Sequence, residues 1–310
     1  MTSAATDLVT LRDLLRYAVS RFGEAGIAYG QGTTNPLDEA AFLLLWSLHL
    51  PIDRLDPFLD ARLLLVERER ALALIEERIA TRKPAAYLTH EAWIGPYRFY
   101  VDERVIVPRS YLGELMNGGL EGVIGDPSEV ARVLDLCTGS GCLAIVAAHA
   151  FPSAHIDAVD ISGDALAVAE RNVAEHGLAD RVRLLQGDLL QPVAGDTYDL
   201  ILSNPPYVSA ASMAAFAPEF SAEPVLAHSG GTDGLDLVRR ILADAGAHLQ
   251  PEGGLLMEVG TGRALLEAEH PELSFLWLDT TESEGEVLWL PGEALQRDGS
   301  PGRRSRQRRR

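Results

Sequence analysis

The chain has 310 residues, of which 47% are hydrophobic, and this is enough to bury the core of two ordinary domains or one large one. Its longest apolar run is too short to span a bilayer, and residues 1–13 lack the basic and apolar regions of a secretion signal, so we expect a cytoplasmic protein with no membrane partner. Six arginines lie within residues 303–310, and without them the formal charge falls from −18 to −24, which argues against a protein that clamps duplex DNA.

The first part of the chain, residues 1–95, is predicted to form a small helical domain. Thr10 and Asp13 form a capping-box pattern ahead of apolar residues at helical spacing, and Asn35-Pro36 has the cap and first-turn proline of a second helix. A third helix is predicted over residues 66–81. The apolar stripes of these helices indicate a core rather than a ligand site.

Residues 96–125 are predicted to bridge this domain to the next one. The stretch "YRFYVDERVIVP" alternates between polar and apolar or β-branched residues, which is typical of short strands, and "YLGELMNGGL" favours a helix or turn. We therefore expect a hairpin-like segment between two domains.

Residues 126–295 are predicted to form an α/β domain with a doubly wound, mostly parallel, Rossmann-like sheet. Apolar runs alternate with helical patterns at about residues 142–150 and 162–176. Continuous apolar runs are typical of parallel strands that are buried on both faces. The last two strands are close enough in sequence to pair antiparallel. The seven predicted strands are "ARVLDLC", "HIDAVDI", "VRLLQGD", "YDLILSN", "GGLLMEVG", "SFLWLDT" and "GEVLWL".

The two cysteines, Cys137 and Cys142, are too few and wrongly spaced for a zinc site, and too few for a disulfide framework. The eight histidines show no ligand spacing either. We therefore expect reduced thiols and no metal.

A glycine-rich loop follows the first strand of the α/β domain, at Gly139-Ser140-Gly141. Such glycines let the backbone turn tightly into a helix whose free amides face the carboxyl edge of the sheet, where ligands bind. Asp160 ends the second strand, where a carboxylate can bind the two hydroxyls of a ribose. These features alone fit both NAD and S-adenosylmethionine.

Two further acids at strand ends help to separate these cofactors. Asp135, beside the glycine loop, is unfavourable next to the pyrophosphate of NAD but can pair with the ammonium group that only S-adenosylmethionine carries. The alternative role for Asp135 is structural, as an aspartate that forms hydrogen bonds to the loop or caps the helix. Asp188 ends the third strand and can accept from an adenine amino group while Leu189 lies against the ring, although an ordinary Asx turn is the alternative.

The fourth strand ends in Asn204-Pro205-Pro206-Tyr207. Because proline fixes φ and donates no hydrogen bond, nearby carbonyl groups stay free to accept, and the Asn204 side-chain oxygen adds a second acceptor. Two acceptors can hold both hydrogens of a planar NH₂ group, and Tyr207 can stack on its plane. Orientation of this kind directs the lone pair of a weakly nucleophilic amide nitrogen toward a methyl sulfonium.

These residues resemble the S-adenosylmethionine-dependent methyltransferases that carry an N/D-P-P-Y motif, and the whole chain except its tail resembles the HemK-like protein glutamine methyltransferases. "RVIVPRS" ahead of the glycine loop and "EVG" at residues 258–260 share this resemblance. It implies a class I methyltransferase fold and a helical domain that recognises the substrate.

Within this family, Pro108-Arg109 is followed by "SYLGEL", which is similar to the PrmB branch that methylates a glutamine in the third-numbered protein of the large ribosomal subunit. Enzymes that act on peptide chain release factors usually continue Pro-Arg-Pro-Glu-Thr-Glu. Tyr111 and Gln31 depart from the branch, where proline and histidine are common. The resemblance therefore implies transfer of a methyl group to the N5 of a glutamine in a ribosomal protein.

The resemblance also implies roles for individual residues. Asn204 to Tyr207 would hold the target glutamine. Arg109 borders the substrate entrance or forms a surface salt bridge, and Glu258 is a site residue or a buried hydrogen-bonding group. The implied cofactor contacts are Cys137, Thr138, Gly139, Ser140, Gly141, Asp160, Leu189 and Asn204.

Three alternatives remain open at this stage: a release-factor methyltransferase, an adenine-amino DNA methyltransferase, and a non-enzymatic ribosome-assembly factor. Residues 296–310 are expected to be a disordered, arginine-rich tail. This tail is either a solvated end or a flexible arm that contacts ribosomal RNA.

Overall fold

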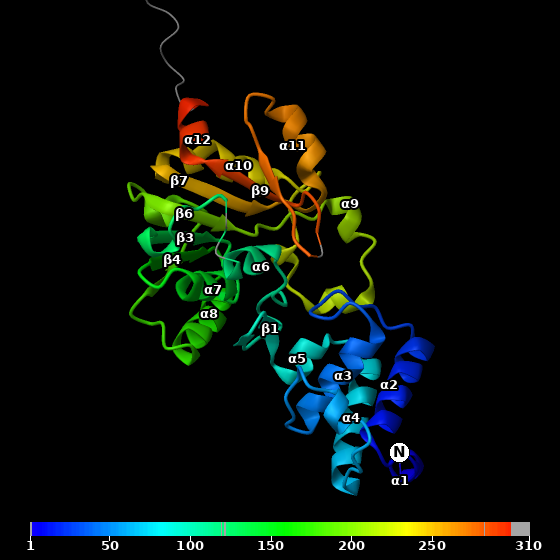
Figure 1. Ribbon diagram of the computed structural model, residues 1–310. Coiled ribbons are helices and arrows are strands. Elements are labelled where there is room, and N and C mark those ends of the chain that lie inside the picture. Colours follow the sequence, from blue (N-terminus) through cyan, green and yellow to red (C-terminus); the bar gives the residue numbers. More distant parts are fainter. Residues whose placement is uncertain (1, 119, 121, 282, 299–310) are drawn as a thin grey trace, which may run out of the picture. The chain divides into compact units, whose positions relative to one another are not determined.

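The computed structural model describes residues 2–298 with the exception of residues 119, 121 and 282, so the arginines at 303–310 lie outside the described residues. The chain forms two compact units (Figure 1). The first unit comprises Met1–Trp93, Tyr100–Arg109 and Phe216–Pro224. The second comprises Ile94–Phe99, Ser110–Ala215 and Val225–Arg310.

The first unit is helical, as the sequence predicts. The capping box is present at α2, where the Thr10 hydroxyl accepts from the Asp13 amide and the Asp13 carboxylate accepts from the Thr10 amide. The Asn35 side chain caps α3 by accepting from the Leu37 and Asp38 amides, and Pro36 occupies the first turn of this helix. The helices are α1 (Thr2–Asp7), α2 (Leu11–Ala25), α3 (Pro36–Ser47), α4 (Leu65–Thr81) and α5 (Ala85–Thr89), with short 3₁₀ turns η1 (Asp56–Phe58) and η4 (Pro218–Ala222).

A seven-stranded sheet forms the centre of the second unit, with the strand order β5-β4-β3-β6-β7-β9-β8. All pairings are parallel except those of β9, which runs antiparallel to both β7 and β8, so the expected mixed sheet is confirmed. The strands are β3 (Arg132–Leu136), β4 (His155–Asp160), β5 (Val182–Gln186), β6 (Tyr198–Ser203), β7 (Leu249–Glu258), β8 (Leu276–Leu278) and β9 (Val287–Pro291). A separate two-stranded sheet consists of β1 (Ala92–Ile94) and β2 (Tyr97–Phe99).

Helices cover both faces of the large sheet, because successive strand residues point to opposite sides. Val133 and Leu202 belong to one buried cluster, which includes residues of α6, α7 and α8. Leu134 and Ile201 belong to the other, which includes residues of α10, α11 and α12. The helices are α6 (Tyr111–Asn117), α7 (Cys142–Ala150), α8 (Gly163–Glu175), α9 (Ala210–Met213), α10 (Asp236–Ala245), α11 (Arg263–Glu269) and α12 (Gly292–Asp298), with 3₁₀ turns η2 (Pro127–Glu129), η3 (Gln191–Val193), η5 (Val225–Ala227), η6 (Gly246–His248) and η7 (Gly260–Gly262).

The carboxyl ends of the central strands meet at one edge of this sheet. Leu136, the last residue of β3, lies opposite Val159 of β4 on one side and Ser203 of β6 on the other. The Ser203 hydroxyl also donates to the Leu136 carbonyl at 3.0 Å. The residues after these strands are therefore brought together, although the sequence separates them by up to about seventy positions.

Among the described residues, no helix has both the length and the apolar content needed to cross a bilayer.

Leu202→Ala should destabilise the second unit by about 2–5 kcal/mol, because Leu202 lies fully buried in a central strand and its loss leaves a cavity. Native-state hydrogen exchange of the β3 and β6 amides measures this change. The matched control is Leu276→Ala in the edge strand β8, where the side chain is 47% exposed and the change should stay within about 0.5 kcal/mol. Equal effects of the two substitutions would contradict the assigned core.

Candidate active site

The glycine loop joins β3 to α7 through three residues with positive φ: Cys137 at 61°, Gly139 at 56° and Gly141 at 79°. A Cβ on Gly141 would lie 3.1 Å from the Cβ of Ala169 in α8, so glycine allows the loop to pass close to that helix. A Cβ on Gly139 would meet nothing within 4 Å. The loop is thus closely packed at one end and open at Gly139.

Asp135 lies directly beneath this loop and is completely buried. Its Oδ2 accepts from the Thr138 hydroxyl at 2.5 Å and from the Ala144 amide at 3.1 Å, so it bonds the loop to the first turn of α7. Its Oδ1 is buried and has no hydrogen-bond partner among the described residues. Burial raises the pKa of Asp135 to about 7.

Asp160 connects the ends of two strands. One carboxylate oxygen accepts from the Gly139 amide at 2.8 Å and the other from the Ser162 amide at 2.9 Å. Burial raises the pKa of this carboxyl group, and the amide donors partly offset that rise. Asp160 therefore holds the open end of the glycine loop, and its contact with a ribose stays a prediction.

Asp188 and Leu189 follow β5 at the same edge of the sheet. Leu189 has a φ of 50° and is buried, while Asp188 forms an ion pair with Arg240 of α10 at 2.8 Å. Arg240 lies 52 residues away and was not predicted to belong to the site. Its guanidinium fixes the Asp188 carboxylate, and the proposed contact of that carboxylate with adenine stays a prediction.

Neither cysteine of this region forms a disulfide. Burial raises the pKa of both cysteines, that of Cys142 to about 12, so neither is a reactive thiolate. The described residues contain no group of three or more side chains suited to bind a metal ion.

The Asn-Pro-Pro-Tyr segment leaves β6 without regular secondary structure, with Pro205 buried and Asn204 half-buried. The chain is then fixed again at Val208, whose amide donates to the His228 carbonyl at 2.9 Å and whose carbonyl accepts from the Gly230 amide at 3.0 Å. Both ends of the segment are therefore held, which gives it the rigidity that the prolines predict.

Tyr207 is positioned by a buried carboxylate. Its hydroxyl donates to Glu258 Oε1 at 2.7 Å, at the end of β7. The other oxygen of Glu258 accepts from the Ser110 hydroxyl at 2.8 Å and the Tyr111 amide at 3.1 Å. Burial raises the pKa of Glu258, and these donors partly offset that rise.

Two glycines allow the close packing of Tyr207. A Cβ on Gly260 would approach the tyrosine ring to 2.8 Å, and a Cβ on Gly234 would approach the Tyr207 carbonyl oxygen to 2.3 Å. The "EVG" pattern at residues 258–260 was the sequence signal for this support, with the acid at the strand end and the glycine two residues later.

Arg109 forms a bidentate ion pair with Glu223, at 2.8 and 3.0 Å, within the first unit. Glu223 is buried and also accepts from the Val107 amide at 2.9 Å. This arrangement supports the salt-bridge alternative for Arg109, and a contact with substrate stays a prediction. Glu223 was missed from the sequence because its partners lie more than a hundred residues earlier.

Phe216–Pro224 packs in the first unit although it follows the Asn-Pro-Pro-Tyr segment closely in sequence. Glu219, in η4, is buried, accepts from the Ala28 amide at 3.0 Å and pairs with Arg82 at 2.7 Å. The boundaries predicted from the sequence place this segment in the α/β domain, because a pattern of local residues does not show which distant arginines will pair with its glutamates.

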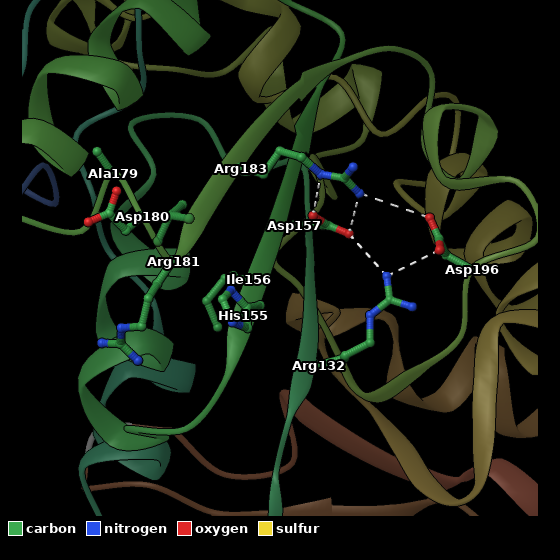
Figure 2. Close-up of a pocket in the computed structure, with 10 residues that line it drawn as sticks. Arg132, His155, Ile156, Asp157, Ala179, Asp180, Arg181, Arg183 and Asp196 are labelled. Carbon is green, nitrogen blue, oxygen red and sulfur yellow. Dashed lines mark hydrogen bonds and ion pairs between the residues drawn. The ribbon is translucent and has the colours of Figure 1, made fainter.

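A cavity of about 580 Å³ lies at the opposite, amino-terminal edge of the sheet, where β4 and β5 begin (Figure 2). Four of its charged side chains pair with one another: Arg183 with Asp157 at 2.7 Å, and Arg132 with Asp196 at 3.2 Å. Burial raises the pKa of Asp157, but hydrogen bonds from Arg183 and Tyr198 lower this pKa by more than burial raises it. The pKa of Asp157 is therefore below its usual value. This cavity contains none of the predicted site residues.

Residues 126–223 match the family described as Methyltransferase small domain. The chain is 57% identical to the ribosomal protein uL3 glutamine methyltransferase of Bradyrhizobium diazoefficiens, over 93% of this chain and 92% of that protein. It is 56% identical to the protein of the same description in Bordetella pertussis, over 93% and 97%, and 54% identical to that of Neisseria meningitidis serogroup B, over 94% and 96%. Among solved structures, a methyltransferase from Pyrococcus furiosus is 18% identical and covers 71% of this chain and 97% of its own, with a TM-score of 0.46. At more than half identity over nearly its whole length, the chain belongs to the family of ribosomal protein uL3 glutamine methyltransferases.

Proposed function

We propose that this chain transfers a methyl group from S-adenosylmethionine to the side-chain amide nitrogen of a glutamine in ribosomal protein uL3. The observation that carries the proposal is the Asn204–Tyr207 segment, which is fixed at both ends and shares one edge of the sheet with the glycine loop. The relatives supply the substrate, because their descriptions name uL3 and glutamine.

The residues at this edge fit S-adenosylmethionine. The buried Oδ1 of Asp135 has no partner among the described residues, and a carboxylate oxygen of this kind suits the ammonium group of an amino-acid tail. The free space at Gly139 lets a ligand approach the backbone closely. Asp160 would bind the ribose hydroxyls, and Asp188 with Leu189 would bind the adenine. When bound, S-adenosylmethionine supplies a methyl group on a positively charged sulfur.

The protein's own contribution is to orient the amide. The Asn204 side-chain oxygen and the carbonyl groups of the proline segment would accept the two hydrogens of the glutamine NH₂ group. Tyr207 would stack on the amide plane, and its ring direction is set by the hydrogen bond to Glu258. As the nitrogen gains positive character, its N–H groups become stronger donors, so these acceptors stabilise the transition state more than the ground state.

The proton balance needs no strong base. Transfer would form a bond between the methyl carbon and the amide nitrogen and would break the carbon–sulfur bond, whose electron pair would stay on sulfur. The nitrogen then loses one proton through its acceptors to water. Glu258 keeps Tyr207 oriented and has no role in taking that proton.

The alternatives differ in substrate rather than in the chemistry of the segment. A release-factor substrate is disfavoured by "SYLGEL" after Arg109, and a DNA substrate by the charge of −24 outside the arginine tail. An assembly factor without activity would not need the intact Asn-Pro-Pro-Tyr segment. A cytoplasmic site of action, and contact of residues 303–310 with ribosomal RNA, belong to the proposal as well.

The proposal is tested by transfer of labelled methyl from S-adenosylmethionine to purified uL3, a release factor and duplex DNA in parallel. Label in uL3 alone is the expected result. Label only in the release factor would refute the substrate, and binding of the cofactor without label in any of the three would refute the activity.

Asn204→Ala should lower kcat by about 100-fold or more, because it removes one hydrogen-bond acceptor for the amide NH₂ group as that group gains positive charge. Much of the affinity for S-adenosylmethionine should remain. Asp160→Ala should show the reverse pattern, with weaker cofactor binding in calorimetry. Steady-state transfer to uL3 and calorimetry together separate the two roles. Unchanged turnover in the Asn204 variant, or wild-type cofactor affinity in the Asp160 variant, would contradict the corresponding assignment.

Tyr207→Phe and Glu258→Gln should each lower kcat on the order of tenfold, because the first removes and the second weakens the hydrogen bond that sets the ring direction. Since the two substitutions act on the same interaction, the double variant should be little worse than either single one. Additive losses in this double-mutant cycle, measured by turnover with uL3, would show that Glu258 does not act through Tyr207.

Affinity for S-adenosylmethionine should rise with pH between about 6 and 8 and be accompanied by proton release. In the ligand-free chain the pKa of Asp135 is raised to about 7, so the neutral acid is populated below that pH, whereas pairing with an ammonium group requires the carboxylate. Calorimetry in two buffers of different ionisation enthalpy measures the release. Asp135→Asn should abolish this pH dependence, and the same dependence in that variant would rule out Asp135 as its source.

A further inference from the structure

The helical first unit contains a small cavity of about 200 Å³. Its walls come from the loop before α3, from Phe42 of α3, from Ile52, from Ala85 and Ala86 at the start of α5, and from residues 91–93. Phe42, Ile52 and the two alanines give it an apolar interior. A volume below the usual range of about 300–1,000 Å³ for small-molecule sites suits a single side chain.

One residue of the cavity lining carries an unsatisfied buried acceptor. Gln31 lines it and is only 3% exposed. The Gln31 amide nitrogen donates to the Glu219 carbonyl at 3.2 Å, which sets the direction of the side chain, while Oε1 is buried with no hydrogen-bond partner among the described residues. A buried acceptor of this kind favours an occupant that brings a hydrogen-bond donor.

Two other lining residues favour a positive charge. Glu91 and Trp93 both line the cavity, and the Trp93 Nε1 donates to the Glu91 carboxylate at 2.9 Å. This bond fixes the indole ring, which is 37% exposed. A carboxylate beside an aromatic face attracts a cation and disfavours an anion.

We propose that this cavity is an anchor pocket for one lysine or arginine side chain of the protein substrate. The aliphatic stem would pack on Phe42 and the alanines, while the charged end would donate to Gln31 Oε1 and lie near Glu91 and Trp93. The inference rests on the proposed function. A protein of the ribosome must neutralise RNA phosphates and is therefore rich in such side chains, and the charge of −24 outside the tail attracts it.

The enzyme side of the test uses the full chain with purified uL3 and the variants Glu91→Gln, Trp93→Ala and Trp93→Phe. Glu91→Gln and Trp93→Ala should each raise the KM for uL3 about tenfold, with kcat within about twofold and the KM for S-adenosylmethionine unchanged. Trp93→Phe keeps an aromatic face and should be closer to wild type. The matched control is Glu77→Gln on the exposed face of α4, which removes the same charge outside the pocket and should leave KM unchanged.

The substrate side identifies the occupant. Lysines and arginines of uL3 are replaced by methionine one at a time, and one replacement should raise KM about tenfold with the wild-type enzyme but cause no further rise with Glu91→Gln. The two proposals can fail separately. Absence of transfer by the wild-type enzyme would remove the proposed function and this inference with it. If methyl transfer is normal and Glu91→Gln and Trp93→Ala keep the wild-type KM for uL3, only the pocket proposal is overturned. The same holds if no lysine or arginine of uL3 shows an effect on KM that depends on Glu91.

Discussion

A single buried carboxylate at the end of β7 holds Tyr207 and the start of α6 in place within the second unit. Glu258 accepts from the Tyr207 hydroxyl with one oxygen and from Ser110 and the Tyr111 amide with the other. A buried carboxylate is costly unless its acceptors are satisfied, so the three donors and the acid stabilise one another. The interaction therefore joins the strand edge, the start of α6 and the Asn-Pro-Pro-Tyr segment into one rigid arrangement.

The acids at the glycine loop hold the loop in place, and both are predicted to bind the cofactor. Asp160 accepts from the Gly139 amide, and Asp135 accepts from the Thr138 hydroxyl and the Ala144 amide, so both hold the loop before any ligand enters. Only the second oxygen of Asp135 lacks a partner among the described residues. A loop that is already bonded in this way loses little conformational entropy on binding, and the remaining oxygen can discriminate for a cationic group.

Much of the fold and the site could be predicted because the determining signals are local. The capping box at Thr10, the alternation of strands and helices, and the acids at strand ends each depend on neighbouring residues or on the geometry of a parallel sheet. The partners of Glu219 and Arg240 were not predictable, because each pair joins residues at least 50 positions apart. The short helices α1, α5 and α12 were missed for a related reason, since segments of five to seven residues carry too few turns to show a period.

The most direct test of the central claim is to map the atom that carries the methyl group in uL3 after incubation with the full chain and S-adenosylmethionine, by tandem mass spectrometry. We expect a methyl group on the side-chain amide nitrogen of one glutamine, because two neutral acceptors and an aromatic face would select a planar NH₂ group. A methyl group on a lysine or arginine nitrogen, with every glutamine unmodified, would contradict it.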